Sequence, residues 1–132
     1  MVKSDLKKVL LQFENAIERF AEVLKKDANI ENAFIDASIQ RFEFCFELCW
    51  KLIQRSLEIE GITVRSPREA FAEALRQDWL PQGDTFWMDM IESRNLSAHT
   101  YKEEMAARIY SLLPGYLEAF ENLAGCLKTR YL

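Results

Sequence analysis

The residue types that could do chemistry in this chain gather in one short polar segment, residues 94–101, which reads Arg-Asn-Leu-Ser-Ala-His-Thr-Tyr. His99 is the only histidine in the sequence, and imidazole is the side chain best suited to proton transfer near neutral pH. The guanidinium of Arg94 can bind a phosphate group through two parallel hydrogen bonds. Together these residues predict a site that binds an anion and moves a proton.

The flanking sequence predicts that this segment joins two helices. We expect one helix to begin at Asp84, as its N-cap, and to reach Arg94. The next would open at Thr100, which forms a Thr-x-x-Glu capping box with Glu103. His99 would then lie one residue before a helix N-terminus, where unpaired N–H groups and a partial positive charge attract phosphate. We predict that the side chains of Arg94 and His99 converge there.

Arginine and histidine beside an anion-binding helix end are suited to cleaving a phosphodiester through attack by a ribose 2′-hydroxyl, without a metal ion. A structural alternative stays open, because a lone histidine beside a helix cap often serves only as a cap or a core neighbour. For Tyr101, at the first helical position, we expect a solvent-accessible hydroxyl close to His99. The alternative there is a partly buried ring that anchors the helix start.

Apolar residues that recur every three or four positions predict the helices that must position this segment. The expected ranges are 4–26, 32–60, about 67–78, 84–94 and 100 onward. Gly61 is expected to cap the second helix, and Ser66-Pro67-Arg68-Glu69 to open the third as a capping box. Pro114-Gly115 predicts a kink or short break in the last helix. The predicted fold is all-α: a single domain over residues 1–132, an antiparallel up-and-down bundle of four to five helices.

The second helix has an unusually wide apolar surface. Two apolar faces require two packing partners, either within the bundle or across a dimer. We predict a homodimer on this aromatic surface, whose main residues are Phe42, Phe44, Phe46 and Trp50. The remaining face, which includes Glu43 and Glu47, is expected to be solvated and braced by an i,i+4 pair of Glu47 with Lys51.

Composition excludes some functions. The formal charge of −4 and the isoelectric point of about 5.1 argue against broad binding to phosphate backbones. A local site for one nucleotide or one scissile phosphate stays open. Cys45, Cys49 and Cys126 lack metal-type spacing and are expected to be reduced core residues. The N-terminus does not read as a signal peptide, and no apolar run approaches the length of a membrane span. We expect a soluble, cytoplasmic protein without metal or other cofactor.

The segment Arg94-x4-His99-x-Tyr101 resembles the Arg-x4-6-His motif of the HEPN superfamily, and most closely the Arg-x4-His-x-Tyr form of HepT-type toxins. Asn95 fits the polar residue that is common after the arginine. Residues 41–51, 66–70 and 87–101 resemble segments that recur in the nucleotidyltransferase substrate-binding protein branch of that superfamily. The likeness covers nearly the whole chain in order.

This resemblance implies a helical bundle that dimerises and brings two Arg-His pairs toward a shared cleft. It also implies a partner, a separate minimal nucleotidyltransferase that is usually encoded by an adjacent gene. In HepT-type pairs the HEPN chain is a ribonuclease toxin, and the partner neutralises it by adding AMP to the motif tyrosine. Carried over, the resemblance makes Arg94 and His99 catalytic, Asn95 supporting and Tyr101 the AMP acceptor.

We therefore predict the toxin-like half of a toxin–antitoxin-like nucleotidyltransferase system, acting as a metal-independent endoribonuclease. One alternative is a non-catalytic adaptor that presents a substrate to the transferase. Another is a dimeric scaffold in which His99 merely packs. RNA or a nucleotide is the expected ligand, and no membrane association is expected. The chain is not itself the transferase, because it lacks a Gly-Ser turn followed by paired metal-binding aspartates.

Overall fold

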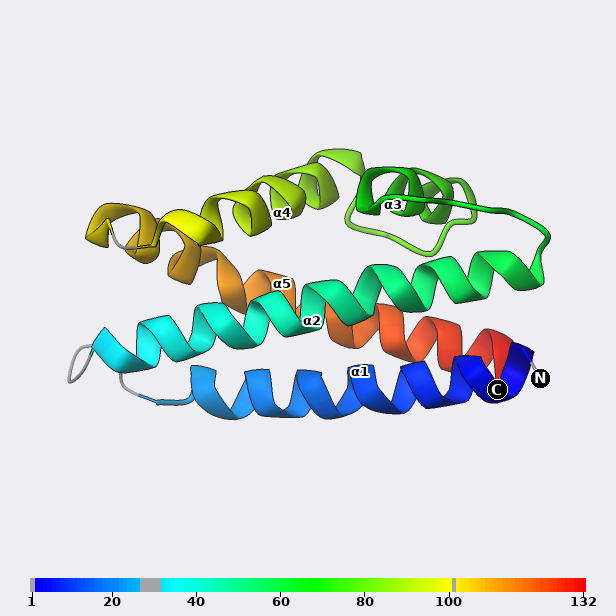
Figure 1. Ribbon diagram of the computed structural model, residues 1–132, viewed down its shortest axis with the longest axis horizontal. Coiled ribbons are helices and arrows are strands. Elements are labelled where there is room, and N and C mark those ends of the chain that lie inside the picture. The colour runs from blue at the N-terminus through cyan, green and yellow to red at the C-terminus, as the bar shows by residue number, and fades with distance from the viewer. Residues whose placement is uncertain (1, 27–31, 101) are drawn as a thin grey trace.

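The computed structural model describes residues 2–26, 32–100 and 102–132, and it confirms the all-α fold. The helices are α1 (Val2–Leu24), α2 (Asn32–Ile59), α3 (Pro67–Arg76), α4 (Asp84–Leu96), the short 3-10 helix η1 (Ser97–His99) and α5 (Glu103–Tyr131). The long helices α1, α2 and α5 pack against one another, while α3 and α4 form a layer over α2 and α5 (Figure 1). Both ends of the chain lie at one end of the bundle, and η1 lies at the other (Figure 1).

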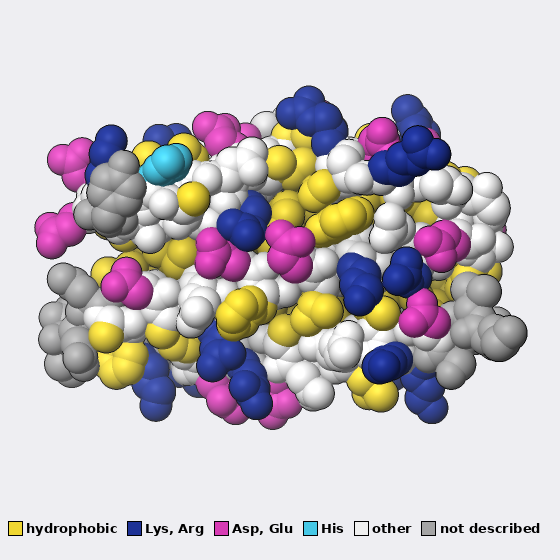
Figure 2. Space-filling model, viewed as in Figure 1, with side chains coloured by type: hydrophobic (Ala, Val, Ile, Leu, Met, Phe, Trp, Pro, Cys, Tyr) yellow, Lys and Arg dark blue, Asp and Glu magenta, His cyan; other side chains and the backbone are white. Residues whose placement is uncertain are grey.

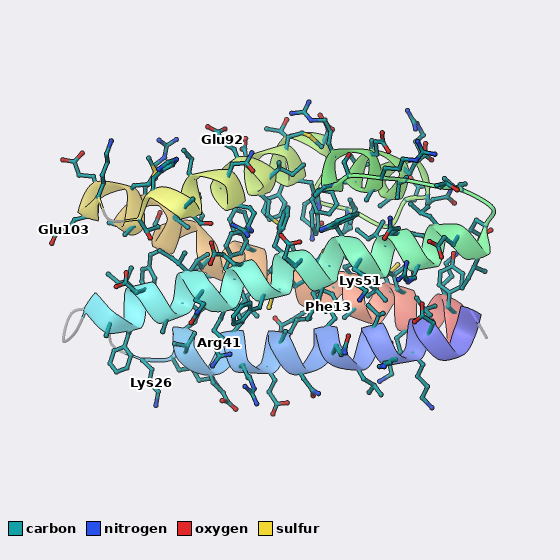
Figure 3. The ribbon with its side chains drawn as sticks, in the orientation of Figure 1. Phe13, Lys26, Arg41, Lys51, Glu92 and Glu103 are labelled. Atoms are coloured by element: carbon teal, nitrogen blue, oxygen red, sulfur yellow. The ribbon has the colours of Figure 1, made fainter. Side chains whose placement is uncertain are left out.

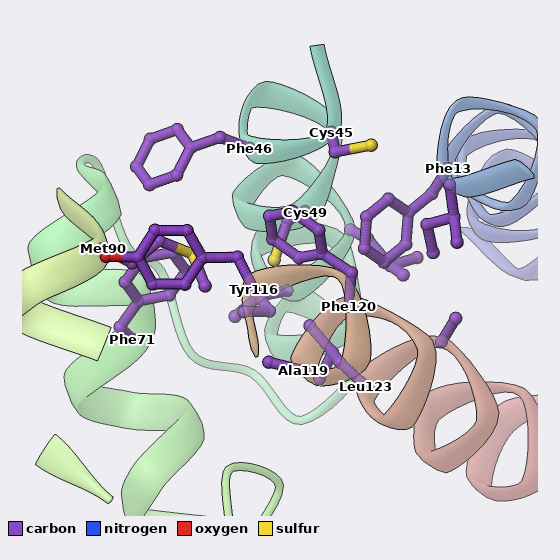
Figure 4. Close-up of a cluster of buried hydrophobic side chains, with 14 of the residues drawn as sticks. Phe13, Cys45, Phe46, Cys49, Phe71, Met90, Tyr116, Ala119, Phe120 and Leu123 are labelled. Atoms are coloured by element: carbon purple, nitrogen blue, oxygen red, sulfur yellow. The ribbon is translucent and has the colours of Figure 1, made fainter. Parts of the chain in front are cut away.

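Aromatic side chains from every layer fill the core. Phe120 of α5 is fully buried. The centroid of its ring lies 5.7 Å from the ring centroid of Phe13 and 6.2 Å from those of Phe20 and Phe42. Figure 4 shows rings from α1, α2, α3 and α5 around this cluster, with the thiols of α2 among them. Burying rings of this size removes a large apolar area from water, which stabilises the bundle without any disulfide.

The ends of the shorter elements follow local chemistry. Ser66 caps α3 by accepting a hydrogen bond from the Glu69 N–H at 3.2 Å, so the predicted N-cap is confirmed. The Glu69 carboxylate, however, accepts from the Arg65 N–H at 2.8 Å. Gly61, at φ 78°, ends α2 as predicted. The Ile62 N–H then reaches the Leu57 carbonyl at 2.9 Å, as in a Schellman motif.

Two predicted helix features are wrong. Asp84 is the first residue of α4, and its N-cap is Gly83 at φ 90°, a conformation that glycine adopts without strain. The helix α5 runs through Pro114, so the predicted short break is wrong, while the kink that was its alternative stays a prediction. Proline removes the hydrogen bond to the Tyr110 carbonyl at that point, but the buried residues on both sides, Leu113 and Tyr116, hold the helix in the core.

The predicted aromatic surface of α2 is divided between core and surface. Phe42 and Phe46 are buried within one chain, where Phe42 stacks on Tyr116 and Phe46 meets Phe71 edge-on, so they cannot form a dimer interface. Phe44 is 48% exposed, and Trp50 is half-buried and donates to the Glu47 carboxylate at 3.1 Å. The two apolar faces of α2 are covered within the chain, because α2 packs on α1, α3 and α5. None of the helices in the described ranges is both long and apolar enough to span a membrane.

Candidate functional site

The segment that carries Arg94 and His99 continues the helix instead of forming a turn. The helix α4 ends at Leu96, η1 carries the chain on to His99, and α5 begins at Glu103 with Lys102 as its N-cap. The N-cap of α5 is Lys102 and not Thr100, so the predicted capping box at Thr100 is wrong. A start at Glu103 places two acidic residues in the first turn, which suits the positive end of the helix dipole. His99 therefore does not directly precede a helix N-terminus.

Arg94 lies against α2 and is held by two carboxylates. Its Nη1 atom lies 3.0 Å from Glu43 Oε2, and its Nε atom lies 3.4 Å from Glu47 Oε1. The side chain of Arg94 keeps 31% of its exposure, so the guanidinium lies near the surface and not deep in the core. Glu47 is exposed as predicted, with 55% of its side chain accessible, but it pairs with Arg94 where Lys51 was expected. Glu43 lies on the same predicted solvated face and is only partly exposed, at 27%.

Ser97 closes this cluster into a ring. Arg94 Nη1 donates to Ser97 Oγ at 3.1 Å, and Ser97 Oγ lies 2.6 Å from both Glu43 Oε2 and the Arg94 carbonyl oxygen. A hydroxyl has one proton, so it donates to one of these oxygens at a time. Ser97 is buried, which makes the ring the polar connection between α2 and the junction of α4 with η1.

His99 is exposed, and the helical path carries it away from this ring. An α-helix turns about 100° per residue and a 3-10 helix about 120°. The five residues from Arg94 to His99 therefore leave their side chains roughly 140–180° apart around the axis. The predicted convergence of both side chains on the N-terminus of α5 is wrong for this reason. Their catalytic roles stay predictions.

The two remaining predicted site residues are Asn95 and Tyr101. Asn95 is exposed in the last turn of α4. Tyr101 lies outside the described residues, so its expected exposure and its closeness to His99 stay predictions. Over the ranges that the structure describes, no group of three histidine, cysteine, aspartate or glutamate side chains could hold a metal ion.

A groove of about 470 Å³ runs between α4 and α5 beside this segment. Its floor contains the buried hydroxyls of Ser93 and Tyr116, 2.8 Å apart. Burial raises the pKa of Tyr116, the hydrogen bond from Ser93 lowers it, and the charges of Asp89 and Glu92 raise it further. The groove is lined by two acidic residues, Asp89 and Glu92, and by Arg108, so its charged lining carries a net negative charge that disfavours a phosphate group.

The charge pattern around the segment points the same way. Glu92 and Glu103 project outward from α4 and from the start of α5 (Figure 3). Figure 2 shows basic and acidic side chains interspersed over the visible face, with the single histidine, in cyan, at the surface. A surface of this kind does not attract a long phosphate backbone, which needs clustered basic residues. The arrangement instead offers an exposed imidazole that a docked macromolecule can reach.

Sequence analysis missed Glu43, Glu47 and Ser97 as members of this site. One signal was present: Arg94 and Ser97 are three residues apart, so they share a helix face, and so do Glu43 and Glu47, which are four apart. What the pattern could not give is that these two faces meet, because they come from helices about fifty residues apart in the sequence.

Comparison with known proteins agrees with this fold. Residues 4–129 match the family described as "Nucleotidyltransferase substrate binding protein like". The "Probable ribonuclease HepT" of Haemophilus influenzae is 30% identical over 94 residues, which are 67% of this chain and 63% of that protein. The match thus spans less than two thirds of that relative's length.

Two solved structures share the bundle. A crystal structure of a Thermus thermophilus protein superposes with a TM-score of 0.81 at 33% identity, covering 87% of this chain and 98% of that one. A Haemophilus influenzae protein, described as having the fold of a substrate binding domain of a nucleotidyltransferase, gives 0.70 at 22% identity, covering 96% and 98%. The family match over residues 4–129, together with this helical fold, shows that the chain belongs to the nucleotidyltransferase substrate binding protein-like family.

Proposed function

We propose that this chain is the HEPN-type partner subunit of a separate minimal nucleotidyltransferase, in a pair of the toxin–antitoxin kind. Membership of the family supports a role beside a transferase. The three cysteines are unpaired, in keeping with a reducing compartment such as the cytoplasm. A homodimer is part of the proposal. Of the α2 residues predicted to form its interface, the Phe44 ring is exposed and available for it.

One observation carries the proposal: the segment around His99 is exposed at the end of the bundle opposite the termini. A transferase must enclose its acceptor in its own active site, which a projecting segment permits and an enclosed pocket would prevent. The acceptor we propose is the Tyr101 hydroxyl. It would attack the α-phosphorus of ATP, lose its proton and release pyrophosphate, leaving AMP on the tyrosine.

The test is co-expression with a minimal nucleotidyltransferase, sought first in the genes that adjoin the gene for this chain. We expect the two proteins to co-purify and, with ATP, one AMP to be added to this chain. Tyr101→Phe should abolish the mass increase, and Tyr110→Phe, an exchange of the same kind within α5, should retain it. Undiminished labelling of the Tyr101→Phe variant would refute the assignment, and a failure to co-purify would refute the partnership.

Cleavage of RNA is the activity we propose for the free subunit, and the 30% identity to a probable ribonuclease favours it. In this scheme His99 takes the proton of a ribose 2′-hydroxyl, which attacks the adjacent phosphorus and expels the 5′-oxygen, and the leaving oxygen takes up a proton from water. The products are a 2′,3′-cyclic phosphate and a 5′-hydroxyl. Because Arg94 and His99 of one chain point apart, the two groups would meet at the phosphate across a dimer. Arg94 of one segment would stabilise the charge on the phosphate, with Asn95 in support, and His99 would come from the other segment.

The assay is cleavage of total cellular RNA in the presence of EDTA. Because a positioned acid–base group contributes about 10²–10⁴-fold in rate, His99→Ala should lose at least two orders of magnitude of activity while remaining folded. Arg94→Ala should be comparably slow. Lys8→Ala, which removes an exposed basic charge from α1, serves as the control and should retain most of the rate.

A non-catalytic adaptor is the second candidate, and the carboxylates around Arg94 favour it. Two acidic groups on the one guanidinium weaken its attraction for phosphate. In this case the chain docks the transferase and presents a substrate to it. A wild-type protein that binds the transferase but leaves RNA intact, both as a dimer and as a monomer, would favour the adaptor over the nuclease.

A further inference from the structure

The contacts of Arg94 leave no edge of its guanidinium open to a phosphate group. A guanidinium holds a phosphate bidentately through one of two edges, Nε with Nη2 or Nη1 with Nη2. In this chain Nε donates to Glu47, and Nη1 donates to Glu43 and to the Ser97 hydroxyl. Each edge therefore includes a nitrogen that is already bound to a carboxylate.

The charge of the cluster has the same effect. One guanidinium with two carboxylates sums to a net charge of −1, so a phosphate that approaches Arg94 meets repulsion where an isolated arginine would attract it. Ser97 strengthens this arrangement, because the oxygen of Glu43 that accepts from Arg94 lies only 2.6 Å from its hydroxyl. Glu43 is thus held from two sides.

We propose that Glu43 and Glu47 form a carboxylate latch that closes Arg94 to phosphate, and that phosphate groups bind at Arg94 only after the guanidinium leaves Glu43. This inference rests on the proposed function, since it concerns the regulation of the same site. It names Glu43 as the residue that determines whether the segment accepts an anion.

The latch is weak enough to open. The side chains of Arg94, Glu43 and Glu47 keep 31%, 27% and 55% of their exposure. Pairs that are exposed to this degree are worth little in water because solvent screens them. Removal of the Glu43 charge should therefore strengthen phosphate binding by about fivefold, the change in affinity that a weak pair of this kind implies.

The experiment is a titration with inorganic phosphate at low salt, followed through the Arg94 Nε–H and His99 signals in NMR spectra. Glu43→Gln is the main variant, because glutamine retains an oxygen that can accept from Ser97 and Arg94 but carries no charge. We expect this variant to bind phosphate about fivefold more tightly than the wild type. Adding Arg94→Ala to it should abolish the response.

Glu58→Gln is the matched control. Glu58 also lies on α2 and pairs with an arginine, at 3.5 Å from Arg55, so this exchange changes the net charge equally but leaves the latch intact. It should bind phosphate as the wild type does. If Glu43→Gln does not fold, Glu47→Gln, which leaves the contacts between Glu43 and Ser97 in place, should show a smaller gain in the same direction.

Equal or weaker phosphate binding by folded Glu43→Gln, or an equal gain in Glu58→Gln, overturns the latch. So does the absence of binding by every variant. These outcomes do not depend on the transferase, because the titration uses this chain alone. If AMP transfer fails but Glu43→Gln binds phosphate more tightly, the proposed function is refuted and the latch is supported. If AMP transfer occurs but Glu43→Gln shows no gain in phosphate binding, the latch is refuted and the proposed function is supported.

Discussion

Among single residues, the cysteines of α2 differ in kind from the third cysteine. Cys45 and Cys49 are fully buried, and burial raises the pKa of Cys45 to about 12 and that of Cys49 well above its usual range. Cys126, on α5, is partly exposed. Because the thiolate is the reactive form of cysteine, the structure separates two inert thiols from one accessible thiol.

We therefore expect one thiol of the native protein to react rapidly with a disulfide reagent such as Ellman's reagent at about pH 8, where an ordinary thiol is partly ionised, and all three to react in denaturant. Mass spectrometry of the alkylated native protein should place the label on Cys126, and Cys126→Ser should remove the fast phase. Rapid native labelling of Cys45 would show that α2 is not packed as described.

The same buried thiols predict a loss of stability in alkali. The pKa of each thiol is higher in the folded state than in the unfolded chain, so above about pH 9 the unfolded state binds fewer protons and the free energy of unfolding falls. The slope approaches about 1.4 kcal/mol per pH unit for each thiol, up to the folded-state pKa. Below about pH 8 this contribution is fully present.

Urea unfolding at a series of pH values from about 7 to about 10 measures this dependence. The Cys45→Ala variant should be less stable at neutral pH, because a small cavity is left, but its stability should fall less steeply above about pH 9. An alkaline slope identical to that of the wild type would exclude Cys45 as its source.

At the scale of the elements, α2 and α3 end in the same way with different residues. Asp78, at φ 62°, follows α3. The Asp78 N–H donates to the Leu75 carbonyl at 3.1 Å, and the Trp79 N–H donates to the Ala74 carbonyl at 3.0 Å. This is the Schellman geometry that Gly61 adopts after α2. A residue with a Cβ is strained in the left-handed region, whereas glycine is not.

Exchanging the two residue types should therefore change stability in opposite directions. Asp78→Gly should raise the free energy of unfolding by about 0.5–1 kcal/mol, and Gly61→Ala should lower it by about 1 kcal/mol. An alanine Cβ at Gly61 would meet no atom within 4 Å, so the loss would report backbone strain and not a clash. Thermal unfolding of both variants checks the signs, and a stabilised Gly61→Ala would contradict the assignment.

At the scale of the whole molecule, the bundle depends on rings that meet from different helices. Phe120 is the common member, in contact with Phe13 of α1, Phe42 of α2 and, at 6.5 Å, Trp87 of α4. Loss of this ring removes contacts to three helices at once, so it should lower the free energy of unfolding of the entire bundle.

Phe120→Ala should accordingly lower the free energy of unfolding by about 3–5 kcal/mol. Phe44→Ala, which removes the same side chain from an exposed position on α2, should change it by no more than about 0.5 kcal/mol. Urea denaturation of the two variants makes the comparison. Sedimentation of Phe44→Ala against the wild type then reports whether that exposed ring serves association, and equal costs in the two variants would refute the described core.

The amino-acid sequence by itself determined the helices and much of their capping. Apolar periodicity, Gly61 and Ser66 are local signals, and each acts within a few residues of the backbone that it shapes. The Arg94–Tyr101 motif was likewise readable from residue types and spacing. The position at which α5 begins was not, because Thr100-x-x-Glu103 is a valid capping box and its sequence cannot reveal that η1 takes up residues 97–99 instead.

Only the tertiary structure decided which surfaces meet. Phe42 and Phe46 are apolar in any arrangement, and their burial within one chain depends on how α3 and α5 pack against α2. The pairing of Arg94 with Glu43 and Glu47 joins residues 51 and 47 positions apart. Such pairs leave no periodic trace, because a charged residue on a helix face reads the same whether it meets water or an opposite charge from another helix.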